Sequence, residues 1–275
     1  MGILNKFALE DDHTSMNTQR SILALLSAAL FSFAAAPVSS GIVYDLNATQ
    51  SILVDTLQGP IYFSTDFTRT TGTGVLDPFL SIQGSPESSG YNLSAGVLDT
   101  KRNGQFTRTQ TMADLQTITV NGIDYYSFLL DINESASTAA SKISLDALKI
   151  YTGSVLQTSL NSLQINATLR IDIDSQQDNT LLYDYKMNSG SGEGDIAFLV
   201  PVSAFAGAQS TDFFYLYQEF GGYGPAYNSE AGFEETRHAG DITFVPIPET
   251  KSIFPILAVL GVVVAGPFIR RCFHP

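Results

Sequence analysis

Short runs of alternating apolar and polar residues fill the middle of the chain, from Gly41 to Phe244, and Gly, Asn, Asp and Ser separate them. Such runs are typical of β-strands, because successive side chains of a strand point to opposite faces. We therefore expect an all-β domain, an antiparallel β-sandwich of jelly-roll-like arrangement, with one short helical turn within 201–208. The predicted strands are 42–46, 51–56, 61–65, 79–83, 105–109, 116–120, 123–133, 144–152, 162–174, 181–187, 195–202, 212–218 and 241–245.

Two segments give the clearest strand patterns. In the first, Asn121-Gly122 is the preferred pair for a two-residue type I′ hairpin turn, since both positions need a positive φ. The strand after that turn places four apolar side chains on one face, which we expect in the core: Tyr126, Phe128, Leu130 and Ile132. In the second, residues 169–174, the apolar side chains Leu169, Ile171 and Ile173 alternate with charged ones, as in a sheet with one wet face.

Both ends of the chain have the pattern of targeting segments. Residues 16–40 predict a signal peptide, with Arg20 before an uncharged stretch from Ser21 to Ala36 and small residues after it. Cleavage is expected between Ser40 and Gly41; the other candidate lies after Ala36. Residues 1–15 carry acidic charge, which is unusual before such a stretch, so we expect translation to start at Met16. A buried N-terminal helix is the competing interpretation.

An uncharged run of 17 residues, 253–269, lies near the other end. At 1.5 Å per residue it spans about 25 Å as a helix, nearly the thickness of a hydrocarbon core. Arg270 and Arg271 follow, and basic residues stay on the cytoplasmic side. The segment therefore predicts a transmembrane helix with a basic tail at 270–275 and the domain of residues 41–244 outside.

A proline-rich motif at residues 245–250 precedes this run, and its two prolines impose an extended backbone. The residues of the motif that carry the likeness are Val245, Pro246, Ile247, Pro248 and Glu249. Motif, helix and arginine pair in this order resemble the PEP-CTERM sorting signal, although the family motif is Pro-Glu-Pro. The resemblance implies processing by an exosortase after the signal peptidase, and an association with exopolysaccharide.

Parts of the β domain are also similar to ectodomains of PEP-CTERM proteins. The matching stretches are 77–83, 121–134, 144–151 and 190–195. This second resemblance implies no established activity.

Charge and cysteine content exclude some function classes. The whole chain has a net charge of −13, and between Gly41 and Pro248 there are 23 acidic and nine basic residues. A nucleic-acid partner requires a basic footprint, so none is expected. The single cysteine, Cys272, excludes a disulfide within the chain.

One acidic stretch is a candidate calcium site. Asp172, Asp174, Asp178 and Asn179 supply several oxygens at a strand end and turn, and calcium takes six to eight oxygen ligands. The stretch lacks the glycine and the closing glutamate of an EF-hand loop. The alternative interpretation is a polar strand face followed by a polar turn.

Catalytic chemistry has little support in the sequence. His238 is the only histidine of the domain, no Gly-x-Ser-x-Gly motif accompanies it, and residues 234–238 are expected to be an exposed polar segment. We therefore expect a protein that is not an enzyme and has no required cofactor. A glycoside hydrolase built on two carboxylates is the weakest of the hypotheses.

A glycine-rich loop, 220–233, carries three aromatic side chains that are candidates for stacking on a sugar or partner: Tyr223, Tyr227 and Phe233. They could equally cap the end of the sandwich. The sequence thus favours an exported cell-surface or exopolysaccharide-associated structural protein. The alternative is a carbohydrate- or calcium-binding surface module.

Overall fold

The computed structural model describes residues 41–69, 77–137, 140–188, 194–230 and 232–244. The chain divides into two compact units, Met1–Val38 and Ser39–Pro275, and all described residues belong to the second. The predicted signal peptide and the predicted sorting region lie outside the described residues.

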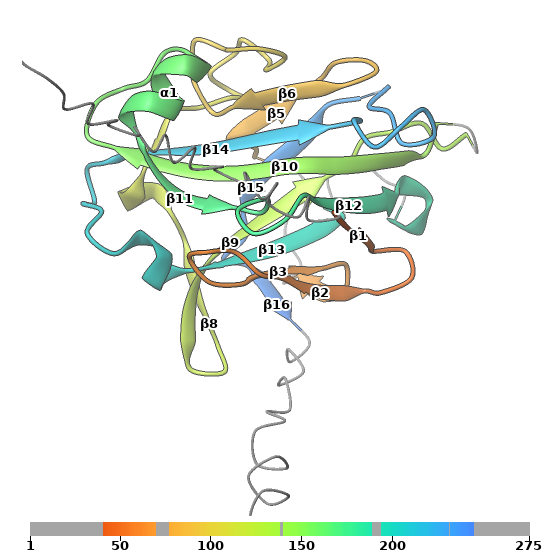
Figure 1. Ribbon diagram of the computed structural model, residues 1–275, viewed down its shortest axis with the longest axis horizontal. Helices are drawn as coiled ribbons and strands as arrows, with labels where there is room; N and C mark the ends of the chain where they lie inside the picture. The colour runs from red at the N-terminus through yellow and green to blue at the C-terminus, as the bar shows by residue number, and fades with distance from the viewer. Residues whose placement is uncertain (1–40, 70–76, 138–139, 189–193, 231, 245–275) are drawn as a thin grey trace, which may run out of the picture. The chain divides into compact units, whose positions relative to one another are not determined.

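The first of two seven-stranded sheets, sheet A, has the strand order β1-β12-β10-β14-β6 (Figure 1). Strand β11 pairs with β10, and β7 pairs with β14. All pairs are antiparallel except β1 and β12, which run parallel. The strands are β1 (Ile42–Asp45), β12 (Asn179–Asp184), β10 (Lys142–Gly153), β14 (Phe213–Phe220), β6 (Ser88–Tyr91), β11 (Thr168–Asp172) and β7 (Gln110–Thr111).

Sheet B has the order β2-β3-β13-β9-β15-β5, with β8 paired to β9, and every pair is antiparallel. Its strands are β2 (Ser51–Val54), β3 (Ile61–Ser64), β13 (Ile196–Pro201), β9 (Ile123–Asp131), β15 (Glu234–His238), β5 (Leu80–Ile82) and β8 (Thr117–Val120). A separate two-stranded ladder joins β4 (Phe67–Arg69) to β16 (Ile242–Phe244).

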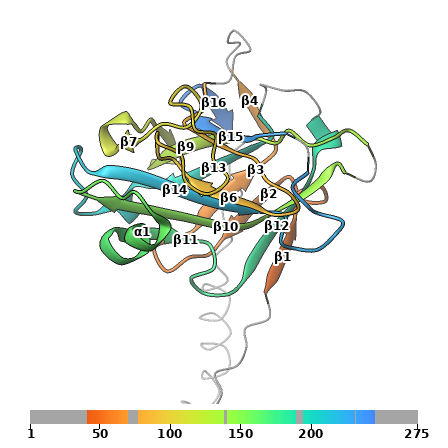
Figure 2. The same ribbon diagram turned by 90° about the horizontal axis from the view of Figure 1, so that it is seen from above.

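The inner faces of the two sheets share one hydrophobic core. Phe128 of sheet B stacks on Phe214 of sheet A, with 5.6 Å between the ring centroids. Other fully buried members come from both sheets, among them Phe63, Phe198, Leu148, Ile150 and Leu216. This two-layer packing confirms the all-β, sandwich-like prediction (Figure 2).

Smaller apolar clusters cover parts of the outer faces. Helix α1 (Leu160–Asn166) lies over sheet A and packs Leu163 against Tyr91, Tyr151 and Tyr215. On sheet B, Ile242 of β16 packs with Leu129 and Ala197. Apolar clusters therefore cover part of the outer face of each sheet.

The predicted hairpin is confirmed. Asn121 and Gly122 have φ values of 51° and 77°, and they join β8 to β9 with Val120 opposite Ile123. The core face of β9 is also as predicted, because Phe128, Leu130 and Ile132 are buried and Tyr126 packs against them. A 3-10 helix, η3 (Val202–Phe205), forms the expected turn after β13.

The strand predicted at residues 162–174 is wrong in its first half, where α1 stands. Ser159 caps this helix by accepting a hydrogen bond from the Ser162 amide at 3.2 Å. Leu169 is expected to face inward but is 39% exposed, because a bulge at Arg170 of β11 aligns Leu169 with Tyr151, whose side chain lies on the outer face of sheet A. Ile171 and Ile173 are buried as predicted.

The strand predicted at residues 105–109 is also absent. The Asn103 carbonyl accepts hydrogen bonds from the Phe106 and Thr107 amides, at 2.8 and 2.9 Å, which folds this stretch as a turn. Pairing with sheet A begins only at Gln110.

The expectation that residues 234–238 form an exposed segment is wrong. They are β15, which lies between β9 and β5, and Glu234 and Thr236 are 0% exposed. The Thr236 hydroxyl donates to Gln218 Oε1 at 2.9 Å, and the His238 ring stacks on Phe79 at 4.6 Å. Hydrogen bonds and ring stacking thus satisfy the polar side chains of a strand whose sequence alone predicts exposure.

Candidate functional site

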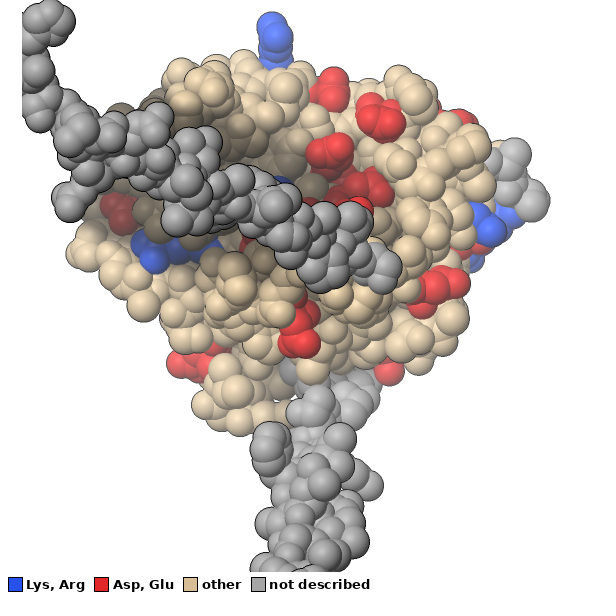
Figure 3. Space-filling model, viewed as in Figure 1, with Lys and Arg blue, Asp and Glu red and all other residues tan. Residues whose placement is uncertain are grey.

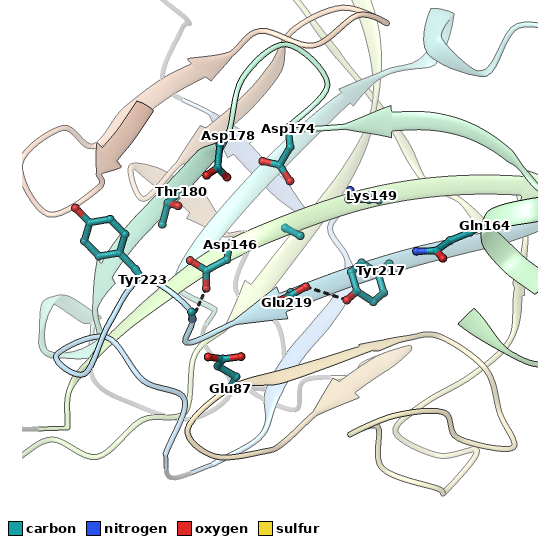
Figure 4. A pocket seen from close by; sticks show the side chains of 12 residues that line it. Glu87, Asp146, Lys149, Gln164, Asp174, Asp178, Thr180, Tyr217, Glu219 and Tyr223 are labelled. Carbon is teal, nitrogen blue, oxygen red and sulfur yellow. Dashed lines mark hydrogen bonds between the residues drawn. The ribbon is translucent and has the colours of Figure 1, made fainter. Parts of the chain in front are cut away.

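A groove of about 600 Å³ lies on the outer face of sheet A. Strands β10, β12 and β14 form its floor, and the loop after β14 supplies part of its wall (Figure 4). Its lining residues are Glu87, Asp146, Ala147, Lys149, Gln164, Asp174, Asp178, Thr180, Tyr217, Glu219, Gly222 and Tyr223.

A β-bulge in β10 places an acidic side chain in this groove. The register with β14 shifts between Leu145 and Ala147, which leaves Asp146 as the extra residue. Leu145 and Leu148 on either side both face the core, so Asp146 and Ala147 share the outer face. Alternation resumes after the bulge, and Lys149 is the next side chain to face outward.

The groove is strongly acidic. Five of its lining residues are carboxylates and one, Lys149, is basic. That ammonium already has a partner, since its Nζ lies 3.2 Å from Asp172 Oδ2. Burial alone would lower the pKa of Lys149, but the Asp172 carboxylate more than offsets it and the pKa stands above its ordinary value. Figure 3 shows Asp and Glu side chains gathered on the face that carries β10 and β14.

Asp146 ties the floor of the groove to its wall. Its Oδ2 accepts hydrogen bonds from the Ser144 hydroxyl and the Gly222 amide, both at 2.7 Å. Burial raises the pKa of Asp146, the two donors act in the opposite direction, and the carboxylates of Glu219 and Glu87 raise it further. A perturbed carboxyl in a concave site is a candidate for ligand binding.

Two tyrosines give the groove its aromatic surface. The Tyr217 hydroxyl donates to Glu219 Oε2 at 3.0 Å, and burial, followed by the charge of Glu219, raises its pKa to about 12. Tyr223 is 47% exposed, and its ring meets Tyr227 edge-on at 5.6 Å. Tyr217 therefore forms part of the floor, whereas Tyr223 offers an exposed ring face at the rim.

The three aromatics of the glycine-rich loop thus have different roles. Tyr223 lines the groove, and Tyr227 stands behind it with Lys142 Nζ 5.6 Å from its ring centroid. Phe233 is not a lining residue; Lys101 Nζ lies 4.3 Å from its ring centroid instead. Only one of the three predicted stacking residues is therefore at the groove.

The predicted calcium residues also divide. Asp174 and Asp178 line the groove, whereas Asp172 binds Lys149. Asn179 is fully buried, and its side-chain amide donates to the Ile173 carbonyl. The Asp174 carboxylate accepts a hydrogen bond from the backbone amide of Asn179 at 3.1 Å.

Burial raises the pKa of Asp174 to about 6, against the effect of the Asn179 amide and with a further contribution from Asp172. Among the described residues, no group of three or more His, Cys, Asp or Glu side chains is arranged to hold a metal ion. The calcium prediction therefore gains no support from this geometry.

Most of the groove was missed from sequence. Glu87 precedes β6, Asp146 and Lys149 lie on β10, Gln164 on α1 and Glu219 on β14, and no local pattern connects these segments. One signal was available, because Tyr215, Tyr217 and Glu219 are spaced two residues apart in β14 and so share one face of the strand.

A second acidic cluster is buried where the interior strands β13, β9 and β15 of sheet B begin or end. Asp195 accepts hydrogen bonds from the Tyr183 hydroxyl and the Ile132 amide, both at 2.7 Å, and burial raises its pKa to about 7. Glu234 is fully buried, and this burial, together with the nearby Glu134 carboxylate, raises its pKa well above the ordinary value. These groups do not line the groove.

The predicted sorting residues, Val245, Pro246, Ile247, Pro248, Glu249, Arg270 and Arg271, lie outside the described residues, as does the apolar run at 253–269. Within the described ranges, no helix is long and apolar enough to cross a membrane. No known protein family, curated protein or solved structure matches the chain.

Proposed function

We propose that the chain is an exported protein of the cell envelope, sorted and processed through its C-terminal segment and associated there with extracellular polysaccharide. The proposed export and sorting are supported by the order of the segments at 245–250, 253–269 and 270–275, and by the signal-peptide pattern at 16–40. Signal peptidase and an exosortase-type enzyme are its processing partners, and the membrane holds it until the second cut.

The groove on sheet A is the observation that carries a glycan-binding role. Its exposed Tyr223 ring can stack on a sugar face, and carboxylates with Gln164 can accept and donate hydrogen bonds to hydroxyl groups. Asp146 and Glu219 lie on the paired strands of the floor, so these carboxylates are held in place before a ligand arrives. A pre-organised site loses less free energy on binding.

The role is binding rather than catalysis. Asp146, a half-buried carboxyl of the groove floor, already accepts one hydrogen bond from Ser144 and one from Gly222 of the wall loop. His238 is half-buried on β15 of sheet B, and this burial lowers its pKa to about 4, so it is neutral, and it does not line the groove. The acidic lining favours a neutral or cationic glycan over an acidic one, since like charges repel.

The intact mass of the native protein and its distribution on cell fractionation test the proposed export and processing. We expect the native protein in the envelope or the medium, with mass lost from both ends. A full-length chain of 275 residues in the cytosol would contradict the proposal.

A glycan array tests the binding role. We expect binding by the wild-type protein that Glu219→Gln and Tyr223→Ala both weaken at least several-fold. Asp124→Asn, which alters an exposed carboxyl on the β8–β9 hairpin, is the matched control and should bind as wild type. Equal binding by all four proteins would place the glycan site elsewhere, and a calcium arm would show whether the ion is needed.

A further inference from the structure

The first described residue, Gly41, lies directly against Asp178, the residue before strand β12. The Ile42 amide donates to the Asp178 carbonyl at 2.9 Å, which sets the parallel register of β1 on β12. A Cβ built on Gly41 would collide with that same carbonyl oxygen and would stand 3.4 Å from the Cβ of Asp178. Position 41 therefore brings the backbone within reach of the Asp178 side chain.

Asp178 is exposed and lines the end of the groove with Asp174 and Thr180. The nearest lining cation, Lys149, is already bound to Asp172. Burial and the neighbouring carboxylates of Asp172 and Asp178 raise the pKa of Asp174. The negative charges at this end of the groove therefore outnumber the positive charges of the lining side chains.

We propose that removal of the signal peptide between Ser40 and Gly41 places a new α-ammonium beside the Asp178 carboxylate, so that processing itself supplies the missing cation. The inference rests on the export proposed above. Water hydrolyses the Ser40–Gly41 peptide bond, leaving a carboxylate on Ser40 and an amine on Gly41. The amine takes up a proton, because an α-amino group has a pKa of about 8.

The uncleaved chain has a neutral amide at the same place. Cleavage therefore adds one positive charge at the end of the acidic groove, anchors the start of β1 and reduces the repulsion among the groove carboxylates. Cleavage after Ala36 would not do so, because four further residues, Pro37 to Ser40, could carry the ammonium up to about 13 Å away.

The test uses the chain from Gly41 to Pro275 in detergent micelles, released from a tag whose removal leaves Gly41 first. Reductive methylation with carbon-13 formaldehyde labels the α-amine and keeps its charge, so NMR can follow its titration. We expect the α-amine pKa to lie about half a unit above that of the Asp178→Asn variant, as for an exposed ion pair. Asp124→Asn is the control and should titrate as the wild type does.

Each outcome decides the inference. An α-amine pKa that Asp178→Asn leaves unchanged would overturn it. So would a native N-terminus at Pro37, found by intact mass, although export itself would stand. A native chain that is neither cleaved nor exported would refute the proposed function, while the titration of the Gly41 form would still show whether the ion pair exists.

Discussion

The buried carboxyl of Asp195 makes the stability of the domain depend on pH. It is 2% exposed, and burial raises its pKa from 3.8 to about 7. A carboxyl whose folded-state pKa is raised stabilises the fold when protonated, and this contribution is lost as pH rises through the folded pKa. The unfolding free energy should therefore fall between pH 5 and pH 8, and the linkage relation gives a loss of about 2–3 kcal/mol for this one group.

Two other acids with raised pKa values act in the same direction. The pKa of Asp174 is raised to about 6, and that of Glu234 is raised well above its usual range, in both cases chiefly by burial. Their contributions also diminish as pH rises, so the domain should be most stable in mildly acidic solution.

Urea unfolding of residues 41–244 at pH 5, 6, 7 and 8, in the presence of a chelator, measures this slope. Asp195→Asn cannot ionise, so its unfolding free energy should change less with pH by about 2–3 kcal/mol across the range. Its absolute stability will be lower, because the amide cannot accept from both Tyr183 and Ile132. A wild-type stability that is flat or rises toward pH 8, or an equal slope in the variant, would refute the reasoning.

Three further predictions concern single residues. Gly122→Ala keeps open space around the new methyl but strains a turn at φ 77°, and should cost on the order of 1 kcal/mol in urea unfolding; no loss would contradict the turn assignment. Gly194→Ala should cost clearly more in the same assay, because its methyl also collides with the buried Leu129 side chain. Asp146→Ala removes the acceptor for Ser144 and Gly222, so limited proteolysis should cut the 222–230 loop faster, whereas unchanged cleavage would show that Asp146 does not hold it.

Sequence reasoning predicted the parts of the fold that local patterns determine. The Asn121-Gly122 turn and the core face of β9 follow from positive φ and from two-residue alternation. Helix α1 was not predicted, because seven residues with one buried side chain, Leu163, show almost no helical periodicity of apolar positions. Strand β15 was not predicted, because its inward residues Glu234, Thr236 and His238 are polar and only tertiary contacts place them inside the domain.

The groove could be predicted only in part. Asp174 and Asp178 were named from local acidity, but the structure places them beside Asp146, Tyr217 and Glu219, which come from other strands. A bulge positions Asp146, and its location depends on the pairing of β10 with β14 rather than on nearby sequence. Sites built across strands in this way become visible only when the register is known.

The central claim is that the β domain is displayed outside the cytoplasmic membrane, and a topology reporter tests it most directly. Alkaline phosphatase, which is active only outside, would be fused after Phe244, and a cytoplasm-dependent fluorescent protein would be fused at the same residue in a parallel strain. We predict phosphatase activity and no fluorescence. Fluorescence without phosphatase activity would contradict the claim.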